Sequence, residues 1–168
     1  TSVTASFAGI TGLAYEAFKD TDKELADRCL NAFTNAINYL IYNQTSTNEM
    51  NPEGFDVGTY YVNNETDERL FAYSVAYKLT RDNKYKDLCM SLLSGGIDAD
   101  DLVANCRIYA YVVMLDSLDY SSDEYNSVKD KLKSECDGLC DSVASNVYAY
   151  PYVMYNWGSN QHVCEGIN

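Results

Sequence analysis

Residues 66–85 read TDERLFAYSVAYKLTRDNKY, and their pattern predicts how the chain folds. Two acids follow Thr66, and a largely apolar run continues to Thr80, as expected for a helix that begins near Thr66. Apolar residues occupy most sides of this helix, which predicts that it packs against neighbours from two directions. After a two-residue turn, residues 83–93 are more charged and predict a second, less buried helix. The stretch therefore predicts a helical hairpin with one inner and one outer helix.

The same pairing of helices is predicted before and after this hairpin. Residues 4–18 and 100–115 are apolar on nearly all sides, and an amphipathic helix follows each of them. The first amphipathic helix is expected to begin at a capping box, Thr21 to Glu24, and the second at another, Ser121 to Glu124. Three hairpins that alternate inner and outer helices are typical of a superhelical array or a closed two-layered barrel. We expect an all-α fold.

The connections between the hairpins are longer than the turns inside them, so these connections should lie at one end of the array. Two of them, residues 43–65 and 146–158, are rich in tyrosine and asparagine and include the single tryptophan, Trp157. They open onto the N-termini of the inner helices, where free backbone N–H groups bind polar ligands. Aromatic rings stack on sugars and amides bind hydroxyls, so this end resembles a carbohydrate site. Packing of tyrosines against the helix ends is the alternative.

The composition indicates a folded protein and excludes several classes of partner. The 168 residues are 46% hydrophobic and 22% charged, and 25 acids against 12 bases give a net charge of -13. Such a charge repels phosphate backbones and anionic lipids, so we expect no nucleic-acid partner and no membrane partner.

Six cysteines and two sequons bear on the cellular compartment. In an exported protein the cysteines would permit several disulfide pairings, and buried free thiols are the equal alternative. The sequons at Asn43 and Asn64 are compatible with N-glycosylation, so we expect an extracellular, secreted glycoprotein. We expect no cofactor and no metal site, because His162 is the single histidine and Cys136 and Cys140 lack a second pair with matching spacing.

The stretch at residues 66–85 closely resembles a segment of family 9 glycoside hydrolases in which an acidic start opens an inner helix. Residues 155–160, YNWGSN, resemble a second segment of that family, in the same order and at about the right distance downstream. The resemblance implies an (α/α)6 barrel, six helical hairpins in two layers with the substrate cleft at one end. It implies that residues 1–168 are a single segment of about three hairpins from the middle of the catalytic domain, with the N- and C-terminal parts missing.

The resemblance also implies a reaction. Family 9 enzymes hydrolyse β-1,4-glucans, chiefly cellulose, with inversion: an Asp activates water and a Glu protonates the leaving oxygen. Both residues are expected outside this chain, so no catalytic residue is assigned here and the chain alone should be inactive. Asp56 is not assigned as the base, because Thr59 stands where a second acid would be and the segment lies in the wrong order.

Binding of a polysaccharide or a cello-oligosaccharide is what the resemblance implies for this chain. Trp157 would stack on a glucosyl ring and a tyrosine would line another subsite, with packing inside the loops as the alternative. The acids of the first helical turn would contact substrate, or would only stabilise the helix dipole, and Arg69 would pair with one of them. The candidate substrate-binding residues are Trp157, Tyr60, Tyr61, Asp67 and Glu68.

Two other functions fit the same sequence. One is a non-catalytic carbohydrate-binding or self-assembling structural protein derived from a glycosidase barrel, whose open three-hairpin array would expose apolar edges and favour self-association. The other is a helical-repeat adaptor. Loss of oligosaccharide binding in a Trp157→Ala variant would separate a glucan-binding chain from an adaptor.

Overall fold

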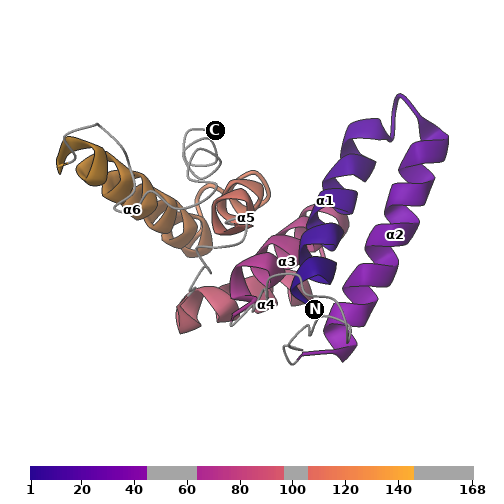
Figure 1. The fold of residues 1–168 in the computed structure, drawn as a ribbon, viewed down its shortest axis with the longest axis horizontal. Helices are drawn as coiled ribbons and strands as arrows, with labels where there is room; N and C mark the ends of the chain where they lie inside the picture. The colour runs from indigo at the N-terminus through magenta and orange to yellow at the C-terminus, as the bar shows by residue number, and fades with distance from the viewer. Residues whose placement is uncertain (45–63, 97–105, 146–168) are drawn as a thin grey trace, which may run out of the picture. The chain divides into compact units, whose positions relative to one another are not determined.

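The computed structural model describes residues 1–44, 64–96 and 106–145, and the regular structure in these ranges is entirely helical. Its helices are α1 (Ser2–Phe18), α2 (Lys23–Tyr42), α3 (Thr66–Thr80), α4 (Asn83–Gly95), α5 (Cys106–Leu115) and α6 (Asp123–Ser145) (Figure 1). Helices α1 to α5 belong to one compact unit, residues 1–117, and α6 belongs to a second, residues 118–168. The predicted all-α class is confirmed.

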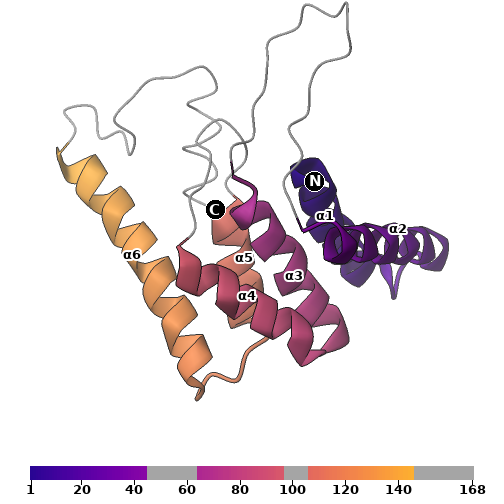
Figure 2. The same ribbon diagram turned by 90° about the horizontal axis from the view of Figure 1, so that it is seen from below.

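Helix α3 is the central helix of the first unit. It packs against α1 and α5, which lie on either side of it, and also against α4 (Figure 2). Every residue from Asp67 to Ala76 is buried. The prediction of an inner helix packed from two directions is confirmed for α3, and its predicted bounds, Thr66 to Thr80, agree with the structure.

Helix α1 approaches α3 closely because the side that faces α3 carries small residues. Ala5, Ala8, Gly9 and Gly12 are all buried. A Cβ atom at Gly9 would lie 2.3 Å from the ring of Phe71, a distance at which one of the two would have to move. Glycine is therefore required there by the close approach of the two helices.

The other side of α1 is apolar yet exposed within the described part of the chain. Val3 is 65% exposed, Phe7 48% and Ile10 61%, and their spacing places them along one face of the helix. The sequence predicts an inner helix packed from two directions. Helix α1 does pack against both α2 and α3, but the face of Val3, Phe7 and Ile10 stays exposed in the described part of the chain.

The N-terminal ends of α1, α3 and α5 lie together. The Thr1 hydroxyl donates a hydrogen bond to Glu65 Oε2, which joins the start of α1 to the start of α3. The backbone N–H of Cys106 donates to Asp67 Oδ2 at 3.0 Å, which joins the starts of α3 and α5.

The C-terminal ends of the same three helices also lie together. Lys78 Nζ of α3 lies 2.8 Å from Glu16 Oε2 of α1 and 2.8 Å from Asp116 Oδ2, just after α5. Arg81 Nη1 donates to the Ser117 carbonyl beyond α5. Because the N-terminal ends of the three inner helices lie together and so do their C-terminal ends, the helices run parallel. The chain must therefore return to the same end of the unit before each one begins.

The outer helices α2 and α4 are amphipathic, as predicted. Helix α4 buries Tyr85, Cys89 and Leu93 on one side. Helix α2 buries a single stripe, made of Ala26, Phe33, Ala36, Ile37 and Leu40. In the second unit, α6 buries only Val128 among its described residues.

Two helices are capped one residue later than the sequence predicts. Asp22 caps α2 by accepting a hydrogen bond at 3.0 Å from the backbone N–H three residues on, while Thr21 lies in the preceding turn. Ser122, rather than Ser121, accepts the corresponding bond at 3.1 Å at the start of α6. The capping-box predictions at Thr21 and Ser121 were therefore wrong in the residue, because neighbouring side chains are equally good acceptors.

The described cysteines bear on the choice between disulfides and thiols. Cys29, Cys89, Cys136 and Cys140 are free thiols, and the Sγ of Cys106 lies 3.7 Å from Ser6 Oγ. Burial raises the pKa of the Cys89 thiol. Cys164 lies outside the described residues.

In the described ranges, no helix is both long and apolar enough to cross a bilayer.

Candidate functional site

The candidate site is the end of the first unit at which α1, α3 and α5 begin, called here the N-terminal end. Helix N-termini carry unsatisfied backbone N–H groups and a partial positive charge, which together favour polar and anionic groups. Helix α2 ends at the same place, so both described ends of the connection between α2 and α3 lie there. This connection is the longest one between described helices of the first unit, and it starts and finishes at the N-terminal end.

Asp67 joins two inner helices at this end. Its side chain belongs to the first turn of α3, but its Oδ2 accepts the backbone N–H of Cys106, the first residue of α5. The residue is only 2% exposed. Its carboxylate thus lies at two helix N-termini, where a negative charge is stabilising. The helix-stabilising alternative accounts for these contacts, and substrate contact by Asp67 stays a prediction.

Glu68 is a buried acid beside Asp67 and is also 2% exposed. Burial in a poorly solvated environment raises its pKa from 4.5 to about 8, and a hydrogen bond to Asp67 and the negative charge of that residue add to the effect. Glu68 is therefore mainly protonated at neutral pH. Among the residues that the structure describes, its Oε2 has no hydrogen-bond partner.

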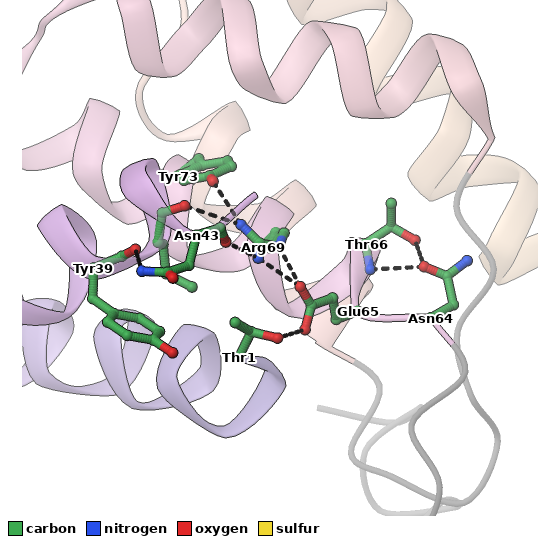
Figure 3. Close-up of polar contacts among 9 residues, drawn as sticks. Thr1, Tyr39, Asn43, Asn64, Glu65, Thr66, Arg69 and Tyr73 are labelled. Carbon is green, nitrogen blue, oxygen red and sulfur yellow. Dashed lines mark hydrogen bonds and ion pairs between the residues drawn. The ribbon is translucent and has the colours of Figure 1, made fainter. Parts of the chain in front are cut away.

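Arg69 pairs with Glu65 and not with Asp67 or Glu68, which corrects the sequence expectation (Figure 3). Its Nε and Nη2 each lie 2.6 Å from Glu65 Oε1. Residues four apart share one face of a helix, whereas residues one or two apart point to different faces. This geometry makes Glu65 the acid within reach of the guanidinium.

The guanidinium of Arg69 also reaches the end of α2. Nη1 donates to the Leu40 carbonyl at 3.2 Å and to the Tyr73 hydroxyl at 3.2 Å, and Nη2 donates to the Asn43 carbonyl at 2.6 Å (Figure 3). The last carbonyls of a helix lack partners inside that helix, and a cation is favourable beside them. Arg69 supplies both the donors and the charge.

The two sequon asparagines lie at the same end of the unit. Asn43 Nδ2 donates to the Tyr39 carbonyl at 2.8 Å, and Asn64 Oδ1 accepts the backbone N–H of Thr66 at 2.9 Å and also the Thr66 hydroxyl. These bonds tie each asparagine to the adjacent helix. Glycosylation of Asn43 and Asn64 stays a prediction.

The aromatic candidates Tyr60, Tyr61 and Trp157 lie outside the described residues. The structure instead adds Glu65 and Thr1, which were not predicted as site residues. The spacing of Glu65 and Arg69, four residues apart across a helix start, is a signal that could have identified that pair. In the described ranges, no group of three or more His, Cys, Asp or Glu side chains could hold a metal ion.

The family model for glycosyl hydrolase family 9 matches residues 1–167. Endoglucanase D of Acetivibrio thermocellus is 27% identical over 166 residues, which are 95% of this chain and 26% of the relative. A cellodextrinase of Butyrivibrio fibrisolvens is 32% identical over 82 residues, 49% of this chain and 15% of the relative. The chain thus spans about a quarter, or less, of the length of these curated relatives.

Solved structures show the same relation. AaCel9A, determined in complex with a cellobiose-like isofagomine, has a TM-score of 0.81 and 26% identity, over 97% of this chain and 31% of that chain. A single-mutant thermostable endoglucanase from Alicyclobacillus acidocaldarius has a TM-score of 0.82 with the same identity and coverage. These structural neighbours have an (α/α)6 barrel fold, and the alternating inner and outer helices found here correspond to part of such a barrel. The chain belongs to glycosyl hydrolase family 9.

Proposed function

We propose that this chain is a segment of an inverting β-1,4-glucan hydrolase, and that it contributes one wall of the substrate cleft and part of its sugar subsites. The observation that carries the proposal is the parallel arrangement of α1, α3 and α5, which brings three helix N-termini to one end of the unit. The names of the relatives, endoglucanase and cellodextrinase, and the cellobiose-like isofagomine in the AaCel9A complex support a glucan as the substrate.

The proposal assigns different roles to the candidate residues. Trp157 stacks on a glucosyl ring, and Tyr60 or Tyr61 lines a second subsite, because flat aromatic faces match the apolar C–H faces of sugars. Asp67 and Glu68 are almost fully buried, so we assign them to support of the N-terminal end beneath the ligand. The acid and the base of the reaction are supplied by parts of the protein outside this chain, which alone is inactive.

The alternative of a non-catalytic binding or self-assembling structural protein is not favoured, since the relatives are hydrolases. Secretion and glycosylation at Asn43 and Asn64 remain part of the proposal.

Inversion is tested in the longer protein by proton NMR of the first product. The α-anomer is expected from a β-linked glucan, and initial release of the β-anomer would contradict inversion.

Sugar binding is tested by titration calorimetry of the chain with cellotetraose. Trp157→Ala is expected to weaken binding by about tenfold or more, because an aromatic anchor in a binding site contributes a large share of the affinity. Tyr120→Ala is the matched control, since Tyr120 is 82% exposed and lies in the turn before α6. An equal loss in both variants, or no binding by the unsubstituted chain, would count against the proposed role.

Self-association of this chain, as distinct from a structural role in place of hydrolysis, is a further part of the proposal. The exposed face of α1, made of Val3, Phe7 and Ile10, is an apolar stripe along one helix. The first 15 residues carry no charged side chain in a chain whose net charge is -13. Two copies repel each other over most of their surfaces, so we propose that they meet at this uncharged stripe.

A further inference from the structure

One side chain, Arg69, holds both described ends of the connection between α2 and α3. Its Nη2 donates to the carbonyl of Asn43, the residue after α2, at 2.6 Å. The same nitrogen lies 2.6 Å from Oε1 of Glu65, the residue before α3. We propose that Arg69 is a positioning residue. It fixes the start and the finish of this connection, and thereby the geometry of the N-terminal end. Its effect on ligands rests on the proposed function.

The shape of the guanidinium permits this role. Arginine presents five N–H donors in a rigid planar fork, and here Nε, Nη1 and Nη2 all make hydrogen bonds. The Arg69 side chain is only 8% exposed and that of Glu65 7%, so water and salt screen these contacts weakly. The positive charge is compensated by Glu65 at 2.6 Å, which is the condition for burying such a group.

The same network extends to α1. Glu65 uses one carboxylate oxygen for Arg69 and the other to accept the Thr1 hydroxyl (Figure 3). The start of α1, the end of α2 and the start of α3 are therefore connected through two charged side chains. A substitution at Arg69 should therefore alter the structure at all three helix ends.

An ion pair alone does not explain this arrangement. A lysine at position 69 would also be a cation four residues from Glu65, and such pairs are common on helices. Arg69 makes further hydrogen bonds, to Leu40, Asn43 and Tyr73, which an ion pair with Glu65 does not require. Lysine has one compact ammonium group and cannot reproduce the fork. Arg69→Lys therefore keeps the charge and removes the connection to α2.

The test compares Arg69→Lys with Arg81→Lys in the 168-residue chain. Arg81 follows the same helix, but it donates to the Ser117 carbonyl at the opposite end of α3. Amide hydrogen exchange is followed by NMR at Asn43 and Thr66, whose N–H groups bond to Tyr39 O and Asn64 Oδ1, both at 2.9 Å. Cellotetraose affinity and the urea midpoint are measured on the same samples.

Arg69→Lys is expected to speed exchange at Asn43 and Thr66 by about tenfold and to weaken cellotetraose binding by about tenfold, the effect of losing a charge-assisted hydrogen bond. Arg81→Lys should leave both quantities within about twofold at a similar urea midpoint. Wild-type exchange in Arg69→Lys would overturn the proposal, and so would equal changes in the two variants.

Two further measurements keep the result decisive. If Arg69→Lys does not fold, the double variant Glu65→Gln with Arg69→Met removes both charges together, and the same exchange outcomes support or overturn the positioning role. If the unsubstituted chain binds no cellotetraose, the proposed function fails. In that case the exchange rates at Asn43 and Thr66 still decide whether Arg69 positions the two ends.

Discussion

Glu68 shows how a single proton allows two adjacent acids to be buried at the start of one helix. Neutral Glu68 forms a hydrogen bond with Asp67, which remains available to accept the N–H of Cys106. Ionisation of Glu68 would place a second negative charge beside Asp67 in a poorly solvated position. The protonated form of Glu68 is therefore the one that the folded chain favours.

The free energy of unfolding should depend on pH through Glu68. Its pKa is 4.5 as a reference and about 8 in the folded chain, so between these values the folded state holds a proton that the unfolded state has released. Stability from this group is complete below about pH 4.5, falls as the pH rises, and is lost above about pH 8, with a total on the order of 5 kcal/mol. Urea denaturation at pH 5, 6.5 and 8 measures the slope.

A Glu68→Gln variant identifies the group responsible for that slope. Glutamine is neutral at every pH and can still donate to Asp67, so the decline between pH 5 and 8 should become much shallower. Glu24→Gln, at an exposed position in the first turn of α2, is the control and should keep the wild-type slope. A slope unchanged by Glu68→Gln would mean that other groups cause the pH dependence.

At the scale of elements, local patterns account for most of what the sequence predicted correctly. The bounds of α3 follow from acids at its start, an apolar run and the turn at Arg81, which adopts a left-handed φ of 57°. The amphipathic stripe of α2 follows in the same way from helical periodicity. The capping residues were predicted less accurately, because Thr21 and Asp22 are both suitable acceptors and only the path of the turn selects between them.

The contacts of the candidate site could not be predicted from local patterns. Asp67 caps α5, a helix that begins 39 residues later, and Arg69 bonds to the Leu40 carbonyl 29 residues earlier. Such partners are set by how the helices pack, and backbone carbonyls carry no sequence signal at all. Glu65 was not predicted, although it lies inside the sequon of Asn64 and four residues before Arg69. The roles of Tyr60, Tyr61 and Trp157 remain predictions.

The packing of α1 on α3 gives a prediction about two glycines. A Cβ atom at Gly12 would lie 2.4 Å from Val75 Cγ1 and 2.9 Å from Phe33 Cδ2, so Gly12→Ala should lower the free energy of unfolding by about 1–3 kcal/mol. Gly138, inside α6, has nothing within 4 Å of such an atom. Gly138→Ala should therefore raise stability by about 0.5–1 kcal/mol through helix propensity.

The comparison separates packing from propensity, because both glycines lie inside helices and both substitutions improve helix propensity equally. Urea denaturation of the two variants, with circular dichroism as the signal, measures the difference. A stabilising effect of Gly12→Ala would show that α1 lies farther from α3 than the structure indicates.

At the scale of the whole molecule, charge and exposed apolar surface have opposite effects on association. The net charge of -13 keeps copies of the chain apart over most of their surface. Repulsion is weak at the stripe of Val3, Phe7 and Ile10, because the stripe is exposed and lies in a part of the sequence without charged side chains. Raising the salt concentration screens the repulsion and leaves the apolar attraction, so association should increase with salt.

Sedimentation velocity of the 168-residue chain tests this expectation. The sedimentation coefficient should rise with protein concentration, and Phe7→Lys should shift the chain towards monomer, because a charge in the stripe cannot be buried between two copies without a large desolvation cost. Asn38→Lys, at an exposed position on α2, makes the same change in net charge away from the stripe and should associate as the unsubstituted chain does. Since each lysine makes the net charge less negative, general repulsion falls equally in both variants, and only contact through α1 predicts a difference between them. Equal behaviour of the two variants, or a monomer at every concentration and salt level, would exclude the α1 stripe as an interface between copies.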